Sequence, residues 1–159
     1  MSVIIVSSDE VRFEVPKDVA FCSEVVKSLL MDATDYSEAI PVYGVDSETM
    51  KVMFEFCEHH IKDPLPVIDK PLRSSIFSEI VPSWYDAFME KEHSVLFKLA
   101  EAANYMDVPP LLNLVCAKIA CMIKDKSVED IRTTFNIPNN FTPEEEAAFE
   151  EESKWCEDA

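Results

Sequence analysis

Cysteine and histidine are the side chains in this sequence that come closest to a metal-binding arrangement. Cys57 precedes His59 and His60 in a segment with a helical pattern, but adjacent residues of a helix point about 100° apart. Cys116 and Cys121 are five positions apart on different sides of another predicted helix, and neither belongs to a C-x-x-C pair. We therefore expect buried thiols and solvated histidines, and no metal site.

The sequence also lacks the backbone signatures of phosphate binding and of nucleophilic catalysis. Its single glycine, Gly44, excludes any Gly-rich phosphate loop and any G-x-S-x-G nucleophile elbow. His93 stands alone near the start of a predicted helix, where we expect a surface histidine. The prediction is a protein that is not an enzyme and binds no cofactor.

Length, charge and cysteine usage limit the remaining classes. A chain of 159 residues fits one domain, with or without a helical extension. The net charge of −17 argues against nucleic-acid and anionic-membrane partners, because such contacts need clustered Lys and Arg. No segment approaches the ~20 apolar residues of a membrane span or resembles a signal peptide. The five cysteines are an odd number and lack the regular spacing of a disulfide framework, which indicates reduced thiols. We therefore expect cytoplasmic and nuclear localisation.

Hydrophobic patterning predicts a small sheet and then helices. Residues 3–6 and 11–15 resemble two strands of a hairpin, and residues 40–43 a third, edge strand. Ser23 is predicted to cap a helix with four inward-facing residues, Val25, Val26, Leu29 and Leu30. Further helices are predicted from Asp46, from Ser83, over residues 92–105, from Ser127 and from Thr142.

Two segments carry more apolar side chains than their predicted surroundings explain. The proline-rich connector 62–82 is apolar enough that we expect part of it to dock, as a short helix near residues 74–80. The helix that follows Pro109 and Pro110 is apolar on nearly every side, which indicates burial on more than one side. The acidic segments after it offer few apolar groups, and Trp155 stands among acids there. Trp155 either folds back onto the core or covers a partner. For the helix that follows Pro109 and Pro110, we expect a partner protein to cover the apolar side chains that the chain leaves exposed.

Short motifs in a fixed order along nearly the whole chain resemble the S-phase kinase-associated adaptor family, which links cullins to F-box proteins in SCF ubiquitin ligases. The motifs are Ser-Ser-Asp at 7–9, Phe-Glu-Val at 13–15, Ala-Ala-Asn-Tyr-Met-Asp at 102–107, Met-Ile-Lys-Asp-Lys at 122–126, Glu-Asp-Ile-Arg at 129–132, Thr-Phe-Asn-Ile at 134–137, Phe-Thr-Pro-Glu-Glu-Glu at 141–146 and Trp-Cys-Glu at 155–157.

The resemblance implies an α+β fold: a BTB/POZ-like domain over residues 1–107, with a three-stranded sheet and surrounding helices, and an F-box-binding helical extension over residues 108–159. It implies cullin contacts by Asn104 and Tyr105. It also implies an F-box surface made of Leu112, Val115, Cys116, Ile119, Ile123, Ile131, Phe135, Ile137, Phe141 and Trp155.

The same resemblance makes Pro143 a candidate for hydroxylation, because several protist members of the family carry this modification in the Phe-Thr-Pro motif; a proline at the first position of a helix is the alternative explanation.

The apolar connector and Glu101 depart from the family pattern. These departures concern the side of the protein expected to bind a cullin and not the side expected to bind an F-box. The function implied is a non-catalytic adaptor between a cullin and F-box proteins, with a possible homodimer when the F-box is absent. The alternative is a self-associating BTB/POZ scaffold outside ubiquitin ligation.

Overall fold

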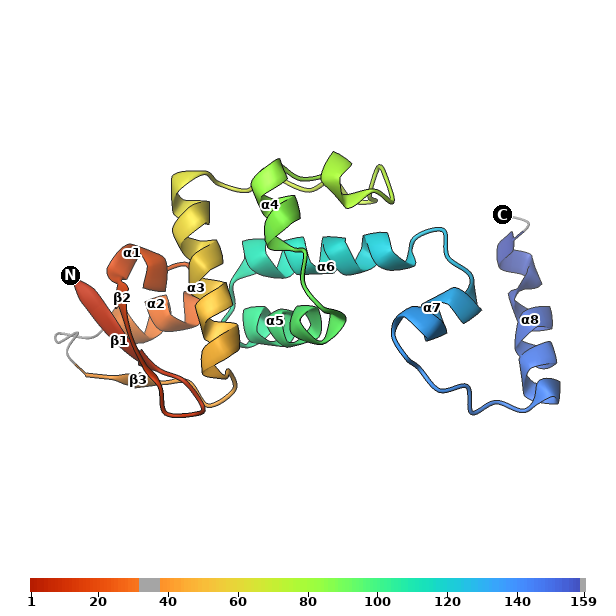
Figure 1. Cartoon of the computed structure of the whole chain (residues 1–159), viewed down its shortest axis with the longest axis horizontal. Helices are drawn as coiled ribbons and strands as arrows, with labels where there is room; N and C mark the ends of the chain where they lie inside the picture. Colours follow the sequence, from red (N-terminus) through yellow and green to blue (C-terminus); the bar gives the residue numbers. More distant parts are fainter. Residues whose placement is uncertain (32–37, 158–159) are drawn as a thin grey trace. The chain divides into compact units, whose positions relative to one another are not determined.

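The computed structural model describes residues 1–31 and 38–157, which divide into two compact units. The first unit is Met1–Asp125 and the second is Lys126–Ala159. The predicted boundary between residues 107 and 108 divides the chain by expected partner and stays a prediction, whereas these units are defined by packing. Figure 1 shows the order of the elements within each unit.

A three-stranded sheet opens the first unit. Strand β1 (Ser2–Val6) pairs antiparallel with β2 (Arg12–Pro16) and parallel with the short β3 (Ile40–Pro41), in the order β2-β1-β3. Alternating residues face the core, so Val3 and Ile5 are fully buried. The third strand is shorter than predicted because the chain turns at Tyr43 and Gly44 toward the next helix. Pro41 lies on an edge strand, as expected.

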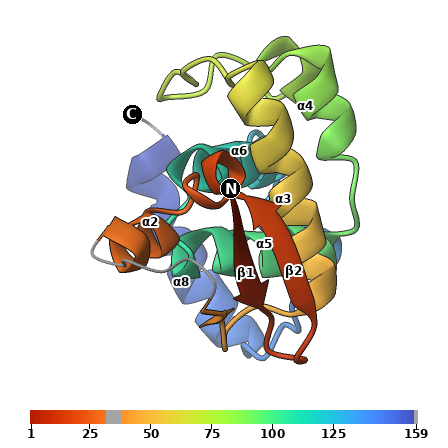
Figure 2. The ribbon, with the colours of Figure 1, turned by 90° about the vertical axis from the view of Figure 1, so that its left-hand side faces the viewer.

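In the described part of this unit, residues 1–31 and 38–125, six α-helices accompany the sheet (Figures 1 and 2). They are α1 (Lys17–Ala20), α2 (Glu24–Met31), α3 (Ser47–Lys62), α4 (Ser83–Phe88), α5 (His93–Tyr105) and α6 (Pro109–Ile123). Asp46 caps α3, because its side chain accepts a hydrogen bond of 2.8 Å from the Thr49 amide. Helices α5 and α6 lie side by side and α3 packs against α5, with one continuous apolar core between these elements.

The inner face predicted for α2 is partly wrong. Ser23 does cap the helix, accepting a hydrogen bond of 3.2 Å from the Val26 amide, and Val26 and Leu30 are buried. Val25 and Leu29 are instead 38% and 58% exposed. Residues 26 and 30 are one helical turn apart, so a single narrow stripe faces the core and the neighbouring residues face outward.

The prediction of solvated histidines is wrong for His59 and His60, which belong to an aromatic cluster. The His59 ring stacks on Trp84 with ring centroids 3.6 Å apart, and His60 stacks on Phe56 at 5.3 Å. The Nδ1 atom of His60 accepts a hydrogen bond of 3.1 Å from the Leu65 amide. Burial lowers the pKa of His60, with a smaller contribution from His59. His93 is exposed, as predicted.

The connector between α3 and α4 docks on the first unit as predicted, although its helical part is a single 3-10 turn, η1 (Phe77–Glu79). Phe77 and Val81 are buried, and η1 lies against α4 and α6. The Lys118 ammonium group lies 4.9 Å from the centre of the Phe77 ring. The chain itself therefore covers one side of α6, which sequence reasoning had assigned to a partner.

Over residues 126–157, the second unit contains two helices with strong local start signals. Helix α7 (Val128–Thr134) begins with a capping box between Ser127 and Asp130. Helix α8 (Pro143–Glu157) begins at Pro143, and the Thr142 amide donates a hydrogen bond of 2.9 Å to Glu145, whose own amide donates to the Thr142 hydroxyl at 3.3 Å. Both capping predictions are confirmed.

The predicted fold class is also confirmed: the structure is of mixed α+β type with a three-stranded sheet. Across residues 1–31 and 38–157, no helix is both long and apolar enough to cross a membrane. The same residues contain no group of three or more His, Cys, Asp or Glu side chains that could hold a metal ion.

Candidate functional site

A stripe of apolar side chains along α6 is incompletely covered. It consists of Leu112, Cys116, Ile119 and Ile123, which we call the α6 stripe. These positions follow the spacing i, i+4, i+7 and i+11, so they share one face of the helix. Cys116 is exposed, Ile123 is 38% exposed, and Leu112 and Ile119 are partly buried. Four of the five α6 residues predicted to contact an F-box therefore lie together on an accessible face.

Val115, the fifth of these residues, is fully buried in the core of the first unit. It lies on the side of α6 that packs inward, next to Leu111 and Leu114, which are also fully buried. The Val115 side chain therefore supports the α6 stripe from beneath and presents no surface to a partner in this structure.

The docked connector borders the other side of α6. The Cys121 thiol lies 3.9 Å from the Ser74 carbonyl oxygen, and Cys121 is buried. Lys118 forms an ion pair of 2.9 Å with Glu90 while its ammonium group lies over Phe77. These contacts occupy the side of α6 opposite the stripe, so the α6 stripe is the accessible apolar face of this helix.

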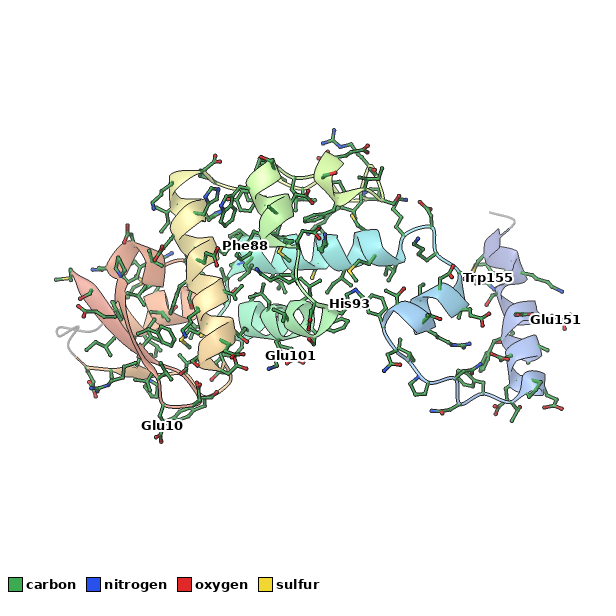
Figure 3. The ribbon with its side chains drawn as sticks, viewed as in Figure 1. Glu10, Phe88, His93, Glu101, Glu151 and Trp155 are labelled. Atoms are coloured by element: carbon green, nitrogen blue, oxygen red, sulfur yellow. The ribbon has the colours of Figure 1, made fainter. Side chains whose placement is uncertain are left out.

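The second unit exposes apolar side chains on and around both of its helices. Ile137, Phe141 and Trp155 are 51%, 49% and 75% exposed, and Trp155 lies on α8 (Figure 3). Ile131 and Phe135 are partly buried. Among residues 126–156, whose side chains the structure describes, none is buried. All five predicted contact residues of this unit thus retain accessible apolar surface.

A small polar and aromatic cluster holds α7 and α8 together within this unit. Arg132 forms an ion pair of 3.1 Å with Glu146, and its guanidinium carbon lies 5.9 Å from the centre of the Phe141 ring. Phe141 meets Phe149 edge to face at 5.1 Å.

Sequence reasoning missed Val128, which is 66% exposed. Val128 precedes Ile131 and Phe135 by three and seven residues, and this spacing indicated a shared helical face.

A second accessible surface lies at the end of α5. Asn104 is exposed and Tyr105 is 49% exposed, as expected for side chains that contact a partner. Phe97 and Glu101 share the face of Tyr105, because the three residues are four positions apart; Figure 3 shows Glu101 on α5. Phe97 is 41% exposed, and this helical spacing is the signal that could have identified it.

The accessible apolar side chains and the compact sheet-and-helix unit together define an α+β protein of the protein–protein interaction class. Two family models match the chain: the Skp1 family tetramerisation domain over residues 1–62 and the Skp1 family dimerisation domain over residues 109–156. The chain is 45% identical over 147 residues to an S-phase kinase-associated protein 1 homolog of Tetrahymena thermophila, covering 92% of this chain and 88% of the relative.

Two further relatives carry names of ubiquitin ligase subunits. The E3 ubiquitin ligase complex SCF subunit sconC of Arthroderma otae is 40% identical over 156 residues, which is 98% of this chain and 94% of the relative. The SCF ubiquitin ligase complex protein SKP1a of Dictyostelium discoideum is 39% identical over 153 residues, which is 96% of this chain and 93% of the relative. The chain belongs to the Skp1 family.

Proposed function

We propose that this protein is a non-catalytic adaptor of an SCF-type cullin-RING E3 ubiquitin ligase, bridging a cullin amino-terminal region to F-box substrate receptors. The relatives named as SCF subunits support this function, because they match almost the whole chain. The observation that carries the proposal is the open α6 stripe together with the exposed apolar residues of the second unit.

The F-box would bind the α6 stripe and the apolar residues of α7, α8 and the segment between them. Burying a Leu, Ile or Phe side chain contributes roughly 1.5–3 kcal/mol, so a few of these residues suffice for a stable complex. Helices α7 and α8 also carry acidic residues in their first turns, and charged groups at an interface favour one partner over another more than they add affinity. Affinity would therefore come mainly from apolar burial.

Charge reversal of the apolar surface tests this assignment. Ile119→Glu in the α6 stripe should weaken binding of an F-box peptide at least about a hundredfold, because it places a carboxylate in a buried apolar contact. Phe135→Glu should do the same from the second unit. Asn113→Glu is the matched control, since residue 113 is exposed on another side of the same helix, with Lys70 3.2 Å from its side chain. Isothermal titration gives the affinities, and normal binding by both test variants would exclude this surface.

The cullin would bind the exposed end of α5, where Asn104 and Tyr105 lie. Tyr105→Lys should abolish cullin binding and leave F-box affinity unchanged, because Tyr105 and the α6 stripe lie on different helices. Pull-down with each partner separately measures this. Loss of both partners together would show that the two binding faces are not separate.

The absence of catalysis and the compartment are part of the same proposal. Relatives named as subunits of a ligase complex support a scaffolding role, in which the chain contributes binding surfaces and no reacting group. All five cysteines are free, which supports residence in the reducing cytoplasm and nucleus.

Pro143 is exposed at the first position of α8, so it is accessible to hydroxylation. Mass spectrometry of protein from its native cell tests this modification.

Self-association through the same apolar surface is the second candidate function. The family model over residues 109–156 is described as a dimerisation domain, which favours a homodimer when no F-box is present. Mass measurement across concentration, with and without an F-box peptide, separates the two functions. An adaptor should become a one-to-one complex with the peptide, whereas an obligate scaffold would remain oligomeric.

A further inference from the structure

The single glycine of the chain lies directly beneath the ring of Tyr105. A Cβ atom built on Gly44 would lie 2.8 Å from Cε2, 2.9 Å from Cδ2 and 3.0 Å from Cζ of that ring. Carbon atoms in contact prefer about 3.5–4.0 Å, so any side chain at position 44 would displace the ring by roughly 1 Å. Gly44 has no positive φ, so its role is this close approach and not an unusual backbone conformation.

The backbone around Gly44 is held in place on both sides. Val42 and Val45 are buried, the Val42 amide donates to Val6 at 2.7 Å, and the Val45 carbonyl accepts from Ser8 at 2.9 Å. The next residue, Asp46, caps α3 and forms an ion pair of 3.3 Å with Lys98 on α5. This segment cannot retreat from the tyrosine without breaking these contacts.

The backbone of Tyr105 is equally constrained. Ala103 and Met106 are fully buried. The Met106 carbonyl accepts a hydrogen bond from the Ser23 hydroxyl, and the Asp107 carbonyl accepts one of 2.9 Å from the Glu24 amide. A collision at position 44 would therefore be relieved by movement of the half-exposed Tyr105 ring, while both backbones stay where they are.

We propose that Gly44 is a positioning residue for Tyr105, whose ring rests on the bare glycine backbone and is presented in one orientation to the cullin. The inference rests on the proposed function and extends the cullin-binding face from α5 onto the turn before α3. Tyr43, which is 79% exposed, is the next aromatic side chain in that turn. A rigidly supported aromatic side chain loses little freedom on binding, which is the property expected of an interface anchor.

A double-mutant cycle tests this role in the full chain. Gly44→Ala should weaken binding of a cullin amino-terminal region roughly tenfold and leave F-box affinity and the melting temperature nearly unchanged. Tyr105→Ala should weaken cullin binding at least as much. Adding Gly44→Ala to Tyr105→Ala should have no further effect, because the ring that Gly44 supports is gone. An equal loss in both backgrounds, or no loss in Gly44→Ala alone, would overturn the inference.

A measurement without cullin separates this inference from the proposed function. If the ring lies over Gly44, its ring current should shift a Gly44 α-proton upfield in the proton NMR spectrum, and Tyr105→Ala should return that proton to an ordinary position. Failure of the wild-type chain to bind any cullin would overturn the proposed function, and with it the role of Gly44 in binding. An unshifted Gly44 α-proton would overturn the contact itself.

Discussion

Asp9 shows how a single side chain joins separate parts of the first unit. Its carboxylate accepts hydrogen bonds from the Ser7 hydroxyl at 2.6 Å, the Ser47 amide at 2.8 Å and the Ser47 hydroxyl at 2.5 Å. The hairpin turn is thereby fastened to the amino-terminal end of α3. The hydrogen bond from the Ser47 side chain, and to a lesser extent the one from Ser7, lowers the pKa of Asp9 to about 2.

The lowered pKa predicts a pH-dependent contribution to stability. An unfolded Asp takes up a proton near pH 3.9, above the folded value, so acid favours the unfolded chain. Asp9→Asn should be less stable than the wild type at pH 7. This difference should persist down to about pH 4 and disappear as the pH falls toward 2. Urea midpoints at several pH values measure it.

Glu10→Gln is the control for this experiment, because Glu10 is the neighbouring exposed carboxylate in the same turn. It should change the urea midpoint little at any pH. A stability difference between wild type and Asp9→Asn that remained constant down to pH 2 would contradict the proposed ionic role of Asp9.

At the scale of elements, the connector determines which side of α6 is open. The 3-10 turn η1 packs against α6 through Phe77, while the α6 stripe on another face remains accessible. An apolar segment that docks in this way removes side chains from water that would otherwise be exposed along α4 and α6. The binding surface of α6 is therefore shaped by a segment of the same chain.

Truncation of the buried connector side chain should show that this docking is structural. Phe77→Ala should lower the free energy of unfolding by about 3 kcal/mol, because it removes a buried ring and leaves a cavity. Ile76→Ala is the matched control, since Ile76 is adjacent and 54% exposed; its effect should stay within about 0.5 kcal/mol. Urea denaturation followed by tryptophan fluorescence compares the two. Equal effects would mean that the connector is not anchored through Phe77.

At the scale of the whole molecule, the two units differ in how much of their surface is buried. The core of Met1–Asp125 contains fully buried side chains from the sheet and from α3, α5 and α6. Among residues 126–156 no side chain is buried, and polar contacts such as Arg132–Glu146 join α7 to α8. The second unit therefore has little apolar burial of its own to stabilise it.

This difference predicts the hydrogen-exchange behaviour of the free and bound chain. Amides of α7 and α8 should exchange faster than those of α3 and α5 in the free protein, because local opening there exposes little additional apolar surface. Addition of an F-box peptide should slow exchange in α7 and around the α6 stripe and leave α3 unchanged. Mass spectrometry of peptic fragments measures both. Equal protection of α7 and α5 in the free chain would contradict the prediction.

The sequence alone was sufficient for the features that depend on neighbouring residues. The two hairpin strands lie where the patterns at residues 3–6 and 11–15 predicted them, and the capping boxes at Ser127 and Thr142 lie where their spacing placed them. These features follow from backbone geometry and hydrogen bonding within a few residues, which a linear pattern contains. The family motifs were equally readable, because they are short and ordered along the chain.

Only the tertiary structure decided the features that join distant segments. The stacking of His59 on Trp84, the burial of Val115, the docking of Phe77 on α6 and the support of Tyr105 by Gly44 each bring together residues from different elements. A helix that is apolar on nearly every side carries no local signal of which side its own chain will cover. That choice depends on the combined packing of the sheet, α5 and the connector, and it leaves the α6 stripe as the face open to a partner.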